Sequence, residues 1–442
     1  MGAVISIREY DKLHIRKERD LSKKVISLAD ASYLQSVVVD NSPVFSFGNR
    51  CLIAQQYVGV IETPDFTIEI LPKLYCEVDN EKLREVLVRM LLVTNQSSSI
   101  RQFKASVSLR KNSLSEIIIQ SFLRELQNYV ESGLQHEYKK IVGNLDKVKG
   151  QILISQQIKK NILAPTKFYC RYSKYVADNE LNQFFKTCLI AMSHVSRDTQ
   201  NKYTIGDLLL LFDEIESVNV DKAIAFRIEF NSINERAHDA YKYGRLFLEN
   251  LHATLNAGLT EVYTMMFDME KLYELFVYRI AYMVFGSRVT YQKKGNYLIS
   301  RNSDGKKFIS LRPDLTIKML NGKQCIVDTK WKLPRKFVKE SDVYQMNAYS
   351  TGIKNVEKVI LLYPHILKSD NLTGQYTILS NDGYLRLIEI RFIDLIQCLD
   401  WKTFLKTFKR QFCDLWNHTG KIGCDLTFDE DAEGLYLVAE TK

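Results

Sequence analysis

The sequence predicts a multidomain α+β or α/β protein with a β-rich N-terminal domain, a helical middle and a C-terminal mixed sheet flanked by helices. Short apolar runs separated by turn residues occupy residues 3–70, as is typical of short strands. Segments with helical spacing follow between residues 81 and 251. Further on, alternating apolar and polar residues flank Asn321-Gly322, which is a strong hairpin signal.

Composition limits the class of protein. The chain has 442 residues, enough for two or three domains, and a formal charge of +9, which favours a polyanionic partner without requiring one. Its eight cysteines are scattered without a C-x-x-C pair, which argues against a zinc ribbon and a disulfide framework. We find no secretory signal, no apolar run long enough to cross a membrane and no P-loop string, so we expect a cytoplasmic protein that binds no nucleotide through a P-loop.

The predicted hairpin carries the residues with the clearest chemistry. Pairing of its strands through a type I′ turn at Asn321-Gly322 brings Asp314 near Asp328. The period of two in the second strand places Asp328 and Lys330 on one face. Two carboxylates suit Mg²⁺, and Lys330 beside them would orient the attacking water and offset charge on a phosphate. The alternative is a solvated ion pair without catalytic function.

A helix expected before the hairpin contains a further carboxylate. Met269–Phe285 is strongly apolar and follows Asp268, a suitable N-cap. Glu274 inside this helix needs a partner or a metal ion, because a buried carboxylate is otherwise costly. Pairing with Arg279 or Lys271 is the simpler alternative.

A second helix is expected after the hairpin. We predict that it begins after Ser341 as N-cap and carries Gln345 and Tyr349 at helical spacing. The alternative is a helix whose aromatic residues only pack. A basic cluster precedes this helix: Arg335, Lys336 and Lys339. It suits contact with a DNA backbone, and the alternative is a solvated loop without such a contact.

The order Pro313-Asp314, then Asp328-Thr329-Lys330, resembles the PD-(D/E)xK nuclease superfamily. The resemblance implies that Asp314, Asp328 and Glu274 are Mg²⁺ ligands and catalytic residues, that Lys330 is the catalytic lysine and that Gln345 supports it. It also implies the following DNA-binding residues: Lys332, Arg335, Lys336, Lys339 and Tyr349.

Several segments in order resemble the McrC family, the nuclease subunits of McrBC restriction systems for 5-methylcytosine DNA. They are Thr67–Leu74 (T-I-E-I-L-P-K-L), Gly133–Tyr138 (G-L-Q-H-E-Y), Lys149–Ile154 (K-G-Q-I-L-I), Phe168–Tyr172 (F-Y-C-R-Y) and Asp178–Asn182 (D-N-E-L-N). The resemblance implies a partner-binding domain over residues 1–165 and a nuclease domain over residues 166–442, with a catalytic core at about 262–400. It also implies a prokaryotic cytoplasmic restriction complex.

The same resemblance implies an McrB-like AAA+ GTPase partner, which binds the GTP and whose hydrolysis this chain stimulates, and double-stranded DNA as substrate. Dimerisation of complexes is one route to cutting both strands. Two other hypotheses stay open: a non-catalytic adaptor that activates an NTPase ring, and a stand-alone nuclease. An Asp328→Ala change separates the nuclease from the adaptor. Only the nuclease is expected to lose DNA cleavage while it still stimulates NTP hydrolysis by the partner.

Overall fold

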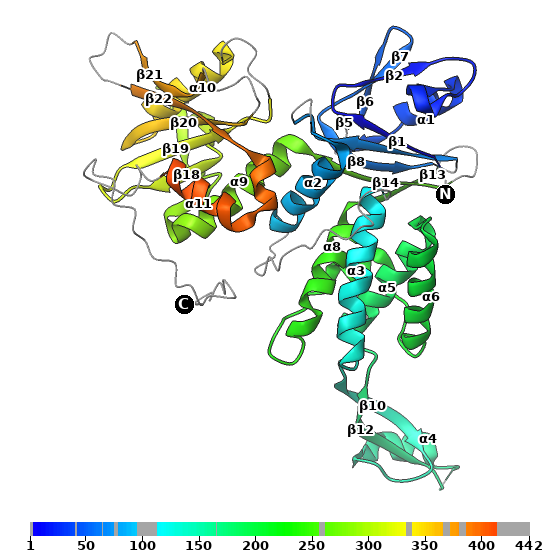
Figure 1. The fold of residues 1–442 in the computed structure, drawn as a ribbon. Coiled ribbons are helices and arrows are strands. Elements are labelled where there is room, and N and C mark those ends of the chain that lie inside the picture. The colour runs from blue at the N-terminus through cyan, green and yellow to red at the C-terminus, as the bar shows by residue number, and fades with distance from the viewer. Residues whose placement is uncertain are drawn as a thin grey trace. The chain divides into compact units, whose positions relative to one another are not determined.

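The computed structural model describes residues 3–39, 42–63, 65–74, 78–94, 113–164, 166–255, 261–332, 338–365, 372–379 and 386–412. The chain forms two compact units (Figure 1). The helical unit comprises Ser115–Leu251, and the composite unit combines the chain before it with the chain after it. The expected boundary between residues 165 and 166 falls inside the helical unit, so the assignment of partner binding and cleavage to the two sides stays a prediction.

The N-terminal part of the composite unit is built on a sheet that uses both halves of the chain. Five strands lie in the order β1 (Ala3–Arg8), β9 (Phe66–Leu71), β8 (Tyr57–Glu62), β14 (Glu261–Asp268) and β13 (Leu251–Leu255). Strands β1 and β9 are parallel, and β8 is antiparallel to both β9 and β14. The chain therefore leaves this sheet, builds the helical unit and returns to the same sheet.

A smaller sheet packs on the same core. It orders β3 (Val25–Ile26), β2 (Lys12–Ile15), β7 (Cys51–Ala54) and β6 (Phe45–Gly48), beside α1 (Leu28–Gln35) and the pair β4 (Val38–Val39) and β5 (Ser42–Pro43). Leu13, Ile61, Ile68 and Met266 belong to one buried cluster, so β14 contributes to the N-terminal core.

Helix α2 (Asn80–Thr94) is tied to this part by a buried ion pair. Arg84 donates to both oxygens of Glu69, each at 2.7 Å. Glu69 is fully buried and also accepts from Ser6. The I-E-I-L-P-K segment thus has a structural role, because its glutamate is the buried partner of α2.

The helical unit consists of a bundle and a small sheet. Its elements are α3 (Leu114–Glu131), β10 (Glu137–Leu145), β11 (Gln151–Ile152), α4 (Ile154–Asn161), β12 (Phe168–Val176), α5 (Glu180–Val195), α6 (Thr199–Leu211), α7 (Val220–Ala225) and α8 (His238–Asn250). Phe122, Phe184, Phe185 and Phe247 are fully buried between the helices. Strand β12 lies between β10 and β11 and is antiparallel to both.

The C-terminal part contains a mixed six-stranded sheet. The order is β15 (Val289–Tyr291), β18 (Leu315–Lys318), β19 (Gln324–Thr329), β20 (Val356–Pro364), β22 (Arg386–Ile393) and β21 (Gly374–Ile378). The central strands β19, β20 and β22 are parallel, and β20 is buried over most of its length, as expected for a strand covered on both faces. Helices α9 (Met269–Phe285), α10 (Glu340–Gly352) and α11 (Trp401–Gln411) flank it (Figure 1).

The hairpin β18–β19 is confirmed, but its turn type was predicted wrongly. The Gly322 amide donates to the Met319 carbonyl, which makes Leu320 and Asn321 the central residues. Within Met319–Lys323, which the structure describes throughout, only Gly322 has a positive φ, 79°. A type I′ turn needs positive φ at both central residues, so Asn-Gly instead forms a longer loop in which glycine takes the left-handed position.

The two helices beside the hairpin differ in how well their starts were predicted. Helix α9 covers Met269–Phe285 as expected, with Asp268 accepting from two first-turn amides. Helix α10 begins at Glu340 with Lys339 as N-cap, and no side chain caps it. The expected cap at Ser341 is therefore wrong, because the first turn starts before that residue. None of the described helices has the length and apolar character needed to cross a membrane.

Candidate active site

The β18–β19 hairpin brings two carboxylates to one place. Leu315 pairs with Val327, which puts Asp314, one residue before β18, opposite Asp328 on β19. One oxygen of Asp314 accepts hydrogen bonds from the amide of Thr329 at 2.7 Å and its hydroxyl at 2.8 Å. Burial raises the pKa of Asp314, although the Thr329 hydrogen bonds oppose this shift.

Asp328 is the most confined acid of the site. Its residue is fully buried, and the ammonium of Lys330 lies 2.5 Å from one of its oxygens. That approach does not have hydrogen-bond geometry, and among the described residues neither oxygen accepts a well-directed hydrogen bond. Burial and the neighbouring charge of Asp314 raise the pKa of Asp328 to about 7. A buried carboxylate is costly unless it is paired, so Asp328 depends on the Lys330 ammonium or on a bound metal ion.

Lys330 is held between the acids and α10. Its ammonium donates to the side-chain oxygen of Gln345 at 3.1 Å, and the Gln345 amide donates to the Tyr349 hydroxyl at 2.8 Å. Tyr349 in turn donates to the main-chain oxygen of Arg312 at 3.1 Å. Burial, the largest single effect, lowers the pKa of Lys330, but Asp328 and the charges of Asp314 and Asp342 together outweigh it, so the net shift is upward and favours the ammonium form. The chain of hydrogen bonds therefore fixes the amine in position.

Glu274 of α9 approaches the site from another side. The Gln292 side chain donates to it at 2.6 Å, and the Gln292 main-chain amide donates to the Asp314 carbonyl at 2.8 Å. Burial and the charge of Asp314 raise the pKa of Glu274, while hydrogen bonds from Gln292 and Tyr291 lower it. Glu274 is thus linked to Asp314 electrostatically and accepts hydrogen bonds from Gln292 and Tyr291. The expected alternatives, pairing with Arg279 or Lys271, stay predictions.

The donor set is compatible with a hard divalent ion. Asp328 offers two buried oxygens without a directed donor, and Mg²⁺ commonly takes one or two carboxylates with water and phosphate oxygens. No set of three acidic, histidine or cysteine side chains in the described part of the chain is close enough to hold a metal ion. Asp314 and Asp328 are therefore the better candidates as direct ligands, and the ligand role of Glu274 stays a prediction.

The residues predicted to bind DNA have different surroundings. Lys332 is 2.6 Å from Asp342 of α10, which also accepts from the Tyr363 hydroxyl. Lys339 is exposed at the start of α10. Tyr349 is only 4% exposed and its hydroxyl bridges Gln345 and Arg312. Arg335 and Lys336 lie outside the described residues.

A link between the site and the N-terminal sheet was not predicted. The indole N–H of Trp331, the residue after Lys330, is 3.0 Å and 3.1 Å from the two oxygens of Glu9. Glu9 is fully buried and also accepts from the Lys73 amide at 2.9 Å. The Trp331 ring lies 5.4 Å from that of Tyr273 on α9. No local pattern signals this contact, because a lone glutamate after a strand resembles a surface residue.

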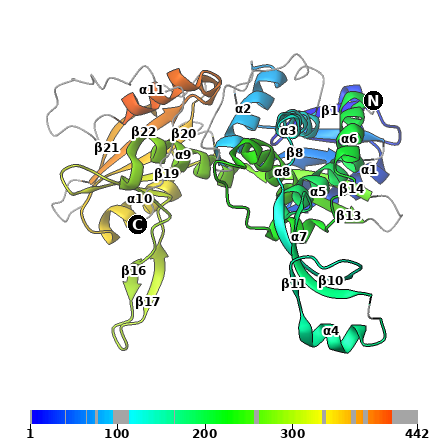
Figure 2. The ribbon, with the colours of Figure 1, turned by 90° about the horizontal axis from the view of Figure 1, so that it is seen from below.

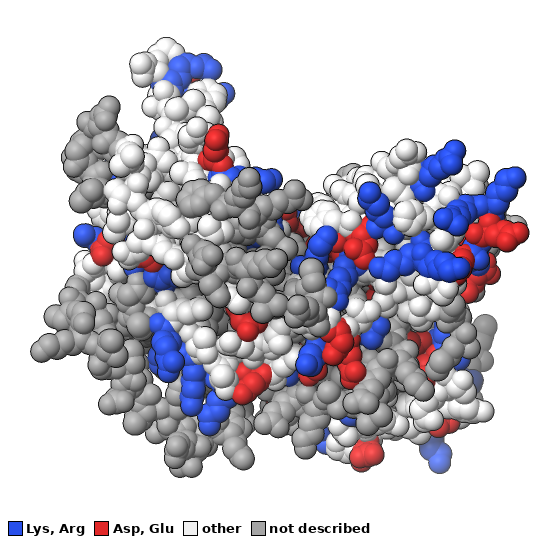
Figure 3. All heavy atoms as spheres, turned by 45° about the horizontal axis from the view of Figure 1, so that its top comes forward, with Lys and Arg blue, Asp and Glu red and all other residues white. Residues whose placement is uncertain are grey.

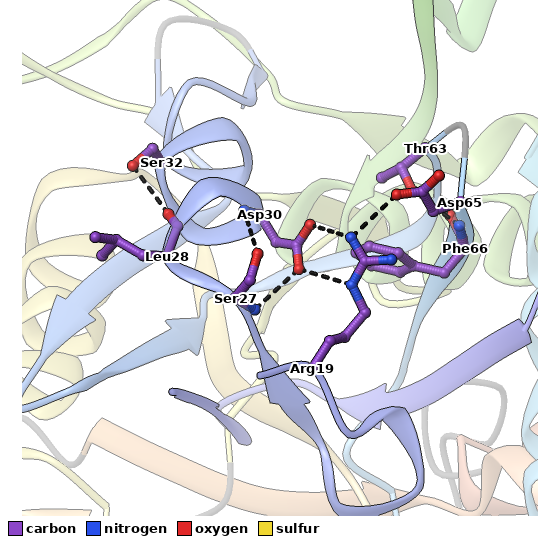
Figure 4. Close-up of polar contacts among 8 residues, drawn as sticks. All are labelled: Arg19, Ser27, Leu28, Asp30, Ser32, Thr63, Asp65 and Phe66. Atoms are coloured by element: carbon purple, nitrogen blue, oxygen red, sulfur yellow. Dashed lines mark hydrogen bonds and ion pairs between the residues drawn. The ribbon is translucent and has the colours of Figure 1, made fainter. Parts of the chain in front are cut away.

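The N-terminal part also holds an arginine with several polar contacts. Arg19 contacts Asp30 through two hydrogen bonds of 2.7 Å and 2.9 Å and reaches Asp65 at 3.1 Å (Figure 4). Its guanidinium lies 4.7 Å from the centre of the Phe66 ring. These contacts give Arg19 a structural role in the N-terminal part.

Comparisons with known proteins identify a family and a shared fold. A family model described as McrBC 5-methylcytosine restriction system component matches residues 52–364. No curated protein matches the chain.

Among solved structures, the chain resembles one in a half-complex of Thermococcus gammatolerans McrB AAA+ hexamers with bound McrC. The TM-score is 0.64 at 18% identity, over 92% of this chain and 100% of that chain. A second match, in the cryo-EM structure of the Thermococcus gammatolerans McrBC complex, has a TM-score of 0.46 at 20% identity over 63% of this chain and 87% of that chain. The first match shows that the fold is shared along nearly the whole chain.

Proposed function

The chain belongs to the McrBC 5-methylcytosine restriction system component family, as an McrC-type member, and we propose that it is the Mg²⁺-dependent DNA endonuclease subunit of such a system. The proposal includes a PD-(D/E)xK active site made of Asp314, Asp328 and Lys330. The observation that carries it is the pair of opposed carboxylates with a lysine ammonium 2.5 Å from Asp328, whose oxygens accept no directed hydrogen bond from described residues.

The residues of the chain perform distinct tasks in this proposal. Asp314 and Asp328 hold the ion, which when bound neutralises charge on the scissile phosphate. Thr329 fixes one oxygen of Asp314, and in this proposal the other oxygen binds the ion. Lys330 is an ammonium, so it donates hydrogen bonds that orient the attacking water and offset the charge that develops on the phosphate.

Gln345 positions the amine of Lys330. Its side-chain oxygen accepts from Lys330 while its amide donates to Tyr349, so the amide cannot rotate without loss of both bonds. This arrangement holds the Lys330 ammonium next to Asp328. Preorganisation of a charged group in this way is a large contribution to catalysis.

The partner in this proposal is an McrB-like AAA+ GTPase, since the solved structure with the same fold contains McrC bound to McrB AAA+ hexamers. The chain would stimulate GTP hydrolysis on that partner and cut double-stranded DNA, with modified foreign DNA as the target. An adaptor without nuclease activity is the second candidate, because an ion pair as short as that of Asp328 and Lys330 also occurs as a purely structural contact.

An Asp328→Asn change in the full chain with its GTPase partner separates these functions. We expect cleavage of duplex DNA to fall by at least about a hundredfold while stimulation of GTP hydrolysis is retained, because one metal ligand is lost and the fold is kept. Glu340→Gln is the matched control, since it removes an exposed carboxylate from the first turn of α10. Calorimetric titration with Mn²⁺ should show binding by the unchanged chain and by the control, and weaker binding by Asp328→Asn.

Two results would contradict the proposal. Cleavage that continues at an unchanged rate in Asp328→Asn places the active site elsewhere. Absence of cleavage by the unchanged chain and partner in Mg²⁺, together with normal GTPase stimulation, favours the adaptor.

A further inference from the structure

A two-stranded ribbon projects from the C-terminal part of the composite unit (Figure 2). Strand β16 (Asn296–Ser300) pairs antiparallel with β17 (Lys307–Leu311), and the pair forms a sheet separate from the six-stranded one. Of residues 296–310, all are exposed except Asn296 and Phe308, which are half-buried. Both faces of the ribbon are therefore open, which is unusual because an isolated hairpin is only marginally stable in water.

The ribbon and the residues that flank it are basic. Residues 293–312 contain six lysines and arginines and one acid, a net charge of five. Arg301, Lys306 and Lys307 lie within the ribbon, and the other three basic residues flank it. On the face drawn in Figure 3, basic and acidic side chains adjoin at several places. The one acid, Asp304, pairs with Arg301 at 3.1 Å. A polyanion is the partner that this segment fits by charge.

Aromatic rings hold the cations along the ribbon. The Lys307 ammonium lies 5.6 Å from the Tyr297 ring centre, and Arg301 and Lys306 lie 5.1 Å and 5.8 Å from that of Phe308. Ile309 is 59% exposed. Exposed apolar side chains between cations suit a partner that offers both negative charge and apolar edges, as the grooves of DNA do.

The base of the ribbon connects directly to the active site. Strand β17 ends at Leu311 and continues through Arg312 and Pro313 to Asp314. Leu311 packs closely against Gly352 at the end of α10, the helix that carries Gln345. A duplex bound along the ribbon would therefore lie close to Asp314 and Asp328.

We propose that the β16–β17 ribbon is a DNA-gripping arm that lies in the major groove of the duplex beside the scissile phosphate. The major groove admits a two-stranded ribbon, and the cations contact the flanking phosphates. This inference rests on the proposed function, since the arm presents DNA to that site. It adds Arg301, Lys306 and Lys307 to the residues expected to bind DNA.

The test is duplex binding by the full chain, measured by fluorescence anisotropy with a labelled duplex over a range of salt concentrations, with Ca²⁺ in place of Mg²⁺ to prevent cutting. In Lys306→Glu/Lys307→Glu we expect affinity to fall by about tenfold or more and the slope of log affinity against log salt to decrease by about two. Lys306→Gln/Lys307→Gln should give a smaller loss. Lys12→Glu/Lys17→Glu, which reverses two exposed lysines of the same unit, is the matched control.

The possible outcomes are distinct from those for the nuclease. Equal affinity and slope in the ribbon variants and the control overturn the arm, as does a chain that binds no duplex at low salt. Ribbon variants that bind DNA normally but lose the GTPase partner also overturn it and identify a protein-binding surface. A loss of binding in the ribbon variants, with no cleavage by the unchanged chain, supports the arm and refutes the nuclease.

Discussion

Replacing Glu9 with glutamine is expected to change how the stability of the composite unit depends on pH. Burial raises the pKa of Glu9 from 4.5 to about 7, against the hydrogen bonds from Lys73 and Trp331. The folded state therefore favours the neutral acid. Its contribution to the free energy of unfolding is fully present below pH 4.5 and is lost as the pH rises through 7.

The shift corresponds to about 3 kcal/mol in total, of which about 2 kcal/mol is lost between pH 5 and pH 8. Glutamine does not ionise, and its oxygen still accepts from the Trp331 indole and the Lys73 amide. Any cost of its buried amide is the same at both pH values, whereas the cost of the carboxylate is not. The free energy of unfolding of Glu9→Gln, relative to that of the unchanged protein, should thus be about 2 kcal/mol higher at pH 8 than at pH 5.

Urea unfolding at pH 5 and pH 8 measures this effect. Trp331 is 8% exposed and contacts Glu9 directly, so its fluorescence reports the relevant region when Trp401 and Trp416 are replaced by phenylalanine. Glu18→Gln, at an exposed glutamate, is the control and should show no pH-dependent gain. A difference between Glu9→Gln and the unchanged protein that is equal at both pH values would refute the reasoning.

Three further predictions follow from the packing and hydrogen bonds. Gly59→Ala places a Cβ 2.0 Å from the Met265 carbonyl oxygen, at a φ of 139°. Thermal unfolding should therefore show a loss of more than about 3 kcal/mol in the free energy of unfolding. Gly206→Ala is the control: its Cβ meets open space in α6, so it should change that free energy by at most about 1 kcal/mol. Gln345→Ala should lower the maximal rate of cleavage by about tenfold or more with unchanged DNA affinity, since it frees Lys330; a loss of affinity alone would contradict this. Glu69→Gln should destabilise the chain by about 3 kcal/mol, because it leaves a buried arginine unpaired; an unchanged urea midpoint would contradict this.

Local chemistry explains what the sequence predicted correctly. The limits of α9 follow from the capping side chain of Asp268 and from Gly286 at its end, both readable within a few residues. The hairpin of β18 and β19 follows from alternation around Asn321-Gly322. The opposition of Asp314 and Asp328 is then a consequence of strand pairing, which is why these residues could be proposed together.

Contacts between distant parts of the chain account for the rest. Glu9 and Trp331 are 322 residues apart, and nothing near either residue signals the other. The pairing of β8 with β14 across the helical unit is likewise invisible to a search for contiguous domains. Thr329, Gln292 and Asp342 are polar residues of ordinary local pattern, and only the folded site shows which acids and amines they contact.

The shared sheet of the composite unit also fixes an order of events during synthesis. Strand β8 lies between β9 and β14, so the edge of β8 has no partner until residues 261–268 leave the ribosome. The whole helical unit is translated before the first sheet can close. A nascent chain that stops before β14 is therefore left with an open, aggregation-prone edge, even though all of β1, β8 and β9 has been made.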